Sequence, residues 1–188
     1  MKCSAPRLLL WLSFLLALGT FCFTGFAHNK GWFDVPTTGK SPSISMWHVC
    51  YDGFWRDCEP VMTQDAKYNY GIAVMVTRVL LITSMFFSLA LTVMGAMTLM
   101  GSYKLIGYTY TFPVVALITA ILLMVGCATF EGGVRLKVLN QILKINEQDI
   151  HSRTYIAGFS AWGAFAMSAI NCVINGLLYL KTRYETYI

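Results

Sequence analysis

The chain has 188 residues, of which 56% are hydrophobic and 12% are charged, and its formal net charge is +5. This charged fraction is about half that of a typical soluble domain. A water-soluble globular fold is therefore excluded, because too few charged side chains are present to cover its surface. The positive charge is dispersed among acidic residues and gives no support for a nucleic-acid partner.

Four apolar stretches are each long enough to cross the hydrocarbon core of a bilayer, which takes roughly 20 helical residues. They cover residues 8–27, 71–101, 105–130 and 155–180, and Arg78 is the one formal charge within them. The sequence therefore predicts a membrane α-helical fold, a bundle of four transmembrane helices that makes residues 1–188 a single domain. Two loops, residues 28–70 and 131–154, and a tail, residues 181–188, join and follow the helices.

The first stretch has two interpretations. Lys2 and Arg7 precede it and residues 25–27 resemble a cleavage site, as in a signal peptide. Its apolar run is longer than the roughly 7 to 15 residues of a signal core, which favours a retained helix. Cys3 beside it is a candidate for S-palmitoylation.

Basic residues predict the orientation. Short segments next to the helices hold Lys2, Arg7, Lys104, Lys181 and Arg183. More basic residues lie in the two longer loops, but short flanking segments count most in the positive-inside rule. We therefore expect both termini in the cytoplasm, both loops outside, and a multi-pass protein of the plasma membrane.

The cysteines divide by location. Cys22, Cys127 and Cys172 lie within the predicted spans, where cysteine commonly serves as a small packing residue. Cys50 and Cys58 share the first loop, where an oxidising compartment favours a disulfide between them. The alternative is a zinc site that adds His48 and Asp57 to these two cysteines, although the spacing matches no standard zinc pattern.

The first loop also carries aromatic motifs. Trp32 follows the first span, Trp47 and Cys50 form a W-x-x-C pattern, and Cys58 comes next. With Arg78 at the start of the second span, these residues resemble the superfamily of claudins, peripheral myelin protein and epithelial membrane proteins. A second register of the motif uses Gly53, Trp55 and Cys58, but no cysteine then follows in the loop. The first register leaves seven residues between its cysteines, fewer than claudins have.

The resemblance implies a small antiparallel sheet in the first loop. Residues 32–35, 44–50 and 54–58 are rich in aromatic and branched side chains, and Asp52-Gly53 between the last two is a hairpin signal. The resemblance also implies that some of the loop tryptophans anchor this sheet on the helices. Membrane-interface enrichment is the alternative explanation for Trp32, Trp47 and Trp55.

The third span is followed by an amphipathic stretch. Residues 134–148 place apolar side chains on one face at helical spacing, which predicts that the helix continues past the membrane with Gly132-Gly133 as a flexible joint. The second loop contains no cysteine, unlike the second outer loops of tetraspanins and connexins.

Small residues at a spacing of four mark one face of two helices, and two asparagines flank the stripe of the fourth. Such faces allow close helix packing in lipid, and asparagine forms bonds between helices. The positions are Ser84, Ser88, Thr92 and Ala96, then Ser160, Ala164, Ser168, Cys172 and Gly176, with Asn171 and Asn175 beside them. Arg78, near a helix end, is interpreted as a structural anchor that reaches water or the first loop.

No motif indicates catalysis, a metal or a cofactor, so we expect a protein that is not an enzyme. Its last residues, with Thr186 and Ile188, resemble ligands of PDZ domains. The leading hypothesis is a claudin-like organiser of cell–cell junctions or a paracellular barrier, which acts by lateral and trans association with itself or another junction protein. The alternative is an auxiliary subunit of an ion channel or neurotransmitter receptor, because stargazin-like calcium-channel gamma subunits share this topology and motif.

Overall fold

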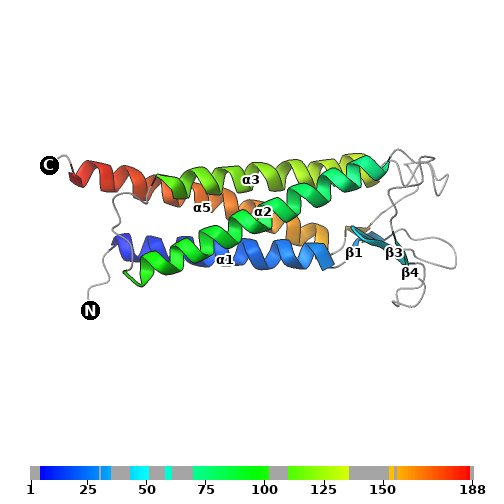
Figure 1. The fold of residues 1–188 in the computed structure, drawn as a ribbon, viewed down its shortest axis with the longest axis horizontal. Helices are drawn as coiled ribbons and strands as arrows, with labels where there is room; N and C mark the ends of the chain where they lie inside the picture. The colour runs from blue at the N-terminus through cyan, green and yellow to red at the C-terminus, as the bar shows by residue number, and fades with distance from the viewer. Residues whose placement is uncertain are drawn as a thin grey trace.

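Four long helices dominate the computed structural model of the chain (Figure 1). The structure describes residues 5–29, 31–34, 43–50, 58–60, 70–101, 110–135, 153–154 and 156–186, and the side chains of residues 7–28, 45–47, 72–101, 110–133 and 158–181. The helices are α1 (Ala5–Asn29), α2 (Tyr70–Leu99), α3 (Thr111–Thr129) and α5 (Ile156–Thr186). A π-helical segment, η2 (Phe130–Arg135), continues α3.

All four helices are long and apolar enough to cross a membrane. The prediction of four helices able to span a membrane is therefore confirmed, and their length and composition are those of a multi-pass membrane protein. Around the bundle, α1 packs against α2 and α5, and α3 packs against the same two helices. Both termini lie at one end of the bundle and the strands lie at the other, which we call the sheet end (Figure 1).

The strands are β1 (Gly31–Asp34), β2 (Ser43–Ser45), β3 (His48–Cys50), β4 (Cys58–Pro60) and β5 (Arg153–Thr154). They pair in the order β4-β3-β2-β1-β5, and all four of these pairings are antiparallel. The strand β5 directly precedes α5 and belongs to the second loop. The sheet therefore combines strands from both loops and not from the first loop alone.

One predicted strand is wrong. Residues 44–50 do not form a continuous strand, because the chain bends at Met46 and Trp47 and returns as β3, with Ile44 opposite Val49. A side-chain bond stabilises the bend: the Trp47 backbone N–H donates to Ser45 Oγ over 3.2 Å. Aromatic and branched residues predicted an uninterrupted strand, but this short-range bond and the burial of Met46 favour a tight hairpin.

The interior of the bundle is unusually polar. Alongside apolar side chains it buries hydroxyl groups of eight threonines and serines from α1, α2 and α3 and both asparagines of α5. Threonine hydroxyls donate to the carbonyl four residues earlier, which satisfies them within their own helix. Many large apolar side chains, among them Phe86, Ile72 and Val79, face outward, as expected for a surface covered by lipid.

Side-chain hydrogen bonds connect α5 to both α1 and α3. Ser13 Oγ on α1 donates to Asn175 Oδ1 over 3.1 Å, and Asn175 Nδ2 donates to Asn171 Oδ1 over 2.8 Å. Ser168 Oγ donates to the carbonyl of Ala116 on α3 over 3.1 Å. Of the two asparagines predicted to bond to a neighbouring helix, Asn175 thus does so within one bundle, whereas Asn171 bonds to Asn175 inside α5.

We expect Asn175→Leu to destabilise the bundle, because Ser13 and Asn171 lose their buried partner while side-chain volume is nearly kept. Hydrogen bonds between membrane helices contribute about 0.5 to 2 kcal/mol. Thermal unfolding in detergent measures the loss, and Ser13→Ala in the Asn175→Leu background should add little. Equal melting temperatures for wild type and Asn175→Leu would contradict this role.

Gly132 and Gly133 do not form a joint between two helices within the described residues, since both lie inside η2, which is continuous with α3. A Cβ on Gly133 would lie 2.9 Å from Ala73 Cβ on α2, closer than atoms pack. Gly133 therefore permits close contact with α2, whereas a Cβ on Gly132 would meet no atom within 4 Å. The amphipathic residues 136–148 that were expected to extend this helix lie outside the described residues.

Gly133→Ala should therefore force α2 and η2 apart and lower stability by about 1 to 2 kcal/mol, within the usual cost of overpacking. Ala73→Gly removes the opposing methyl group, so the double variant should recover most of the loss. Melting temperatures of the two single variants and the double variant form the test. Additive losses would show that this contact does not set the helix separation.

Candidate functional site: the docking of the loop turn on the bundle

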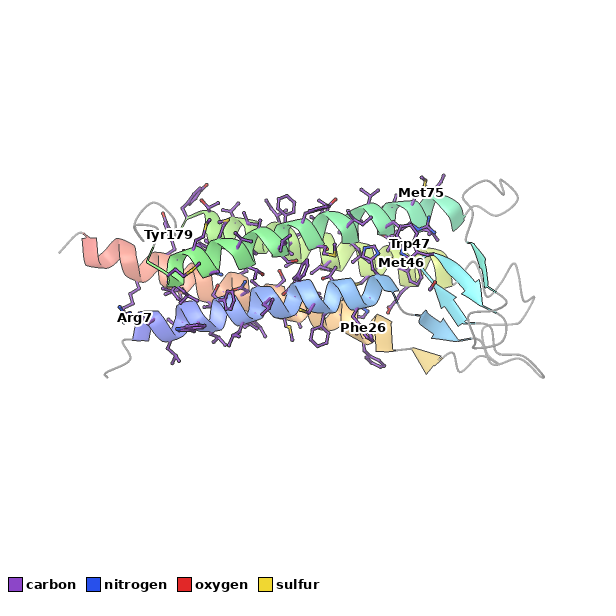
Figure 2. The ribbon with its side chains drawn as sticks, turned by 60° about the horizontal axis from the view of Figure 1, so that its bottom comes forward. Arg7, Phe26, Met46, Trp47, Met75 and Tyr179 are labelled. Carbon is purple, nitrogen blue, oxygen red and sulfur yellow. The ribbon has the colours of Figure 1, made fainter. Side chains whose placement is uncertain are left out.

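The Met46-Trp47 turn between β2 and β3 lies against the sheet end of the helices (Figure 2). Met46 is fully buried, while the side chain of Trp47 remains 38% exposed. The turn is thus inserted at the point where the loop meets the bundle. We call Met46, Trp47, His28 and Arg78 the docking site.

Arg78 supplies the polar contacts of the docking site. It lies in α2, and its guanidinium donates to the Met46 carbonyl from Nε over 2.9 Å and also from Nη2. Its Cζ atom lies 4.4 Å from the centroid of the Trp47 ring. A cation over an indole face at this distance is attracted by the ring quadrupole. One side chain therefore binds both the backbone and the aromatic ring of the turn.

His28 supplies the surface of α1 in the docking site. It is 8% exposed, and its ring stacks on Trp47 with 6.0 Å between centroids and 30° between planes. Its Nε2 atom is buried and makes no hydrogen bond within the described part of the chain. The contact is therefore aromatic packing, which joins α1 to the loop as Arg78 joins α2.

A second polar contact at this end connects α3 and α5. Trp162 Nε1 donates to Glu131 Oε1 over 2.9 Å. Glu131 is the acidic residue in the first turn of η2, where the chain passes from α- to π-helical geometry. The indole N–H thus binds one oxygen of Glu131 and links η2 to α5 at the sheet end.

Only some of the residues predicted from sequence come together in the described structure. Trp47 and Arg78 meet, whereas Trp32 belongs to β1 and its side chain lies outside the described residues. Gly53 and Trp55, of the second motif register, and Cys3 also lie outside the described residues. The sequence predicted that Arg78 reaches either water or the first loop, and in the structure it reaches the first loop.

The backbones of Cys50 and Cys58 are directly opposite each other in the β3–β4 pair. Their side chains, and those of His48 and Asp57, lie outside the described ones, so the disulfide and the zinc alternative both stay predictions. Cys22, Cys127 and Cys172 are free thiols. Within the described residues, no group of three His, Cys, Asp or Glu side chains is placed to hold a metal ion.

The tail differs from an extended ligand. α5 continues to Thr186, and Ile188 lies beyond the described residues. Because PDZ domains bind their ligands as an added strand, capture of this tail requires the last turn of α5 to unwind.

Sequence reasoning missed His28, the Met46 carbonyl and the Trp162–Glu131 bond. His28 was one histidine among three without a motif, and its place at the very end of the first span was the available signal. A carbonyl acceptor leaves no mark in the sequence, because every residue carries one.

No protein-family model matches the sequence, and no curated protein matches it. The role of the docking site must therefore be inferred from its own geometry.

Proposed function

We propose that this chain is a claudin-like membrane protein that organises contacts between cells through lateral and trans association. One observation carries the proposal: Arg78 and His28 hold the Met46-Trp47 turn, and with it the hairpin of β2 and β3, on the ends of two helices. A presented surface binds more tightly when it is already ordered, because less conformational entropy is lost on association. A hairpin fixed to the bundle suits adhesion better than a free loop does.

The proposed orientation puts the sheet outside the cell. Arg7 lies at the end of the bundle opposite the strands (Figure 2). Lys181 belongs to the last part of α5, which ends on that same side (Figure 1). Basic residues that flank membrane helices favour the cytoplasmic side. The termini would then be cytoplasmic, and the strands would form the extracellular sheet of a claudin-like plasma-membrane protein.

The opposed register of β3 and β4 supports a disulfide between Cys50 and Cys58. Directly opposed residues of antiparallel strands have Cα atoms about 4.5 to 5.5 Å apart. Disulfides span Cα separations of about 4.4 to 6.8 Å. With the sheet facing an oxidising compartment, the pair would close the loop that contains Gly53 and Trp55.

Co-culture of expressing and non-expressing cells tests the proposed function. A tagged chain should concentrate at borders between two expressing cells, and not at borders with a non-expressing cell. Arg78→Met should reach the cell surface but lose this enrichment. Val79→Leu, at an adjacent side chain that is exposed on the outside of α2, is the matched control and should behave like wild type.

Diffuse staining of wild type at the surface of paired cells would contradict the proposal. Native purification separates it from the alternative: stoichiometric recovery with an ion channel or receptor would favour an auxiliary subunit. Recovery with copies of itself or with a junction protein supports the organiser.

A further inference from the structure

The four helices reach different heights at the sheet end. A Cβ on Gly95 of α2 would contact Phe14 of α1 at 3.5 Å. Counting 15 residues along each antiparallel helix from that contact places Asn29, the last residue of α1, level with about Leu80. α2 begins at Tyr70 and therefore extends ten residues farther, a rise of about 15 Å along its axis.

Of the other two helices, α5 begins near the height at which α1 ends, whereas α3 extends with α2. Ser13 of α1 bonds to Asn175 of α5, so the end of α1 is level with about residue 159, close to the start of α5 at Ile156. Gly126 packs on Leu81 and Gly133 on Ala73, so α3 and η2 accompany α2 along its extension. At the sheet end, α2 and η2 thus rise as a pair beyond α1 and α5.

The extension of α2 carries an exposed apolar face. Ile72 is 72% exposed and Val79 is 62% exposed, and Met75 and Val76 between them are exposed as well, whereas Val74 and Thr77 are buried. The four exposed positions have the spacing of one helix face. We call Ile72, Met75 and Val76 the raised α2 face.

The same exposed face continues down the whole helix through Phe86, Val93 and Met100. From Ile72 to Met100 it measures about 42 Å along the axis, against a hydrocarbon core of about 30 Å. Among the described side chains of α1, residues 7–28, the large exposed apolar positions run from Leu8 to Phe26, about 27 Å. The apolar belt of the bundle is therefore much taller on the α2 side.

We propose that acyl chains cover the raised α2 face, so that the chain selects a bilayer whose leaflet at the sheet end is thicker than average. Continuity identifies lipid as the occupant, because the raised face is an uninterrupted extension of the lipid-facing side of a membrane-spanning helix. Tilt of α2 shortens the excess without removing it, and thick membranes are those rich in sterols and sphingolipids. The inference does not depend on a junctional function.

Photocrosslinking of the full chain in lipid nanodiscs tests the occupant. p-Benzoylphenylalanine in place of Met75 should give covalent phospholipid adducts by mass spectrometry, as it should in place of Phe86, the control deeper on the same face. Covalent dimers at position 75 would overturn the proposal in favour of a second copy. Crosslinks to the chain's own loops, or no adduct at position 75 while position 86 reacts, would overturn it too.

Reconstitution tests the preference for thickness. Melting temperatures are measured across phosphatidylcholines from dimyristoleoyl to dinervonoyl chains, and wild type should be most stable in chains longer than dioleoyl. The polar variant Ile72→Thr, Met75→Gln, Val76→Thr should move the optimum to shorter chains, whereas Ile72→Val, Met75→Leu, Val76→Ile should keep it. One shared optimum for wild type and the polar variant would overturn the proposal.

Discussion

Arg78→Met should be the most damaging single substitution in the docking site, with an expected loss of about 2 to 4 kcal/mol. The change leaves the Met46 carbonyl without the guanidinium that binds it and removes the cation from the Trp47 ring. A hydrogen bond to a charged group contributes about 1.5 to 3 kcal/mol, and a cation–π contact about 0.5 to 2 kcal/mol. Methionine keeps much of the apolar stem, so most of the loss reports on the polar contacts.

Thermal unfolding in detergent and amide exchange of residues 43–50 measure this effect together. Exchange in the β2–β3 hairpin should rise in Arg78→Met, while exchange in the middle of α3 should change little. Arg78→Lys keeps the charge but not the paired donors, so its stability and hairpin exchange should fall between those of wild type and Arg78→Met. Wild-type exchange in the hairpin of Arg78→Met would show that the turn is held by packing alone.

Cys50→Ser should lower stability by about 2 to 4 kcal/mol if the proposed disulfide is present, which is the typical contribution of such a bond. Cys58→Ser and the double variant should give the same loss, because each removes the same covalent link. Cys22→Ser, at an exposed free thiol on α1, is the control and should be neutral.

The bond itself is detected by alkylation before and after reduction, followed by peptide mass spectrometry. Under non-reducing conditions the peptides of Cys50 and Cys58 should be recovered linked and without label. Labelling of both thiols before reduction would contradict the disulfide. Protection of both thiols that is lost on chelation would instead support the zinc alternative.

The helices were predictable from sequence and the contacts between them were not. Apolar runs of sufficient length determine a span directly, because the backbone must satisfy its own hydrogen bonds in lipid. By contrast, the hairpin at Met46-Trp47 depends on a carbonyl bound by Arg78, 32 positions later in the chain. Local propensity contains no information about that partner.

The docking site was half predictable for the same reason. Arg78 stands out because a charge in a span is rare and costly to place. Trp47 stands out because it forms a W-x-x-C pattern with Cys50. His28 does not stand out, because a histidine at the end of a span is an ordinary residue in an ordinary place and matches no motif. Gly133 was recognised as unusual, but whether a glycine provides flexibility or close approach depends on Ala73 opposite it.

The pairing of β1 has a consequence for engineering. β1 pairs with β2 on one side and with β5 on the other, so Phe33 faces both Ile44 and Thr154 across the strands. A chimaera that exchanges only residues 31–60 with another protein would pair the incoming β1 with a β5 that it did not evolve beside. Transplantation of binding properties between such chains would therefore have to carry both segments together.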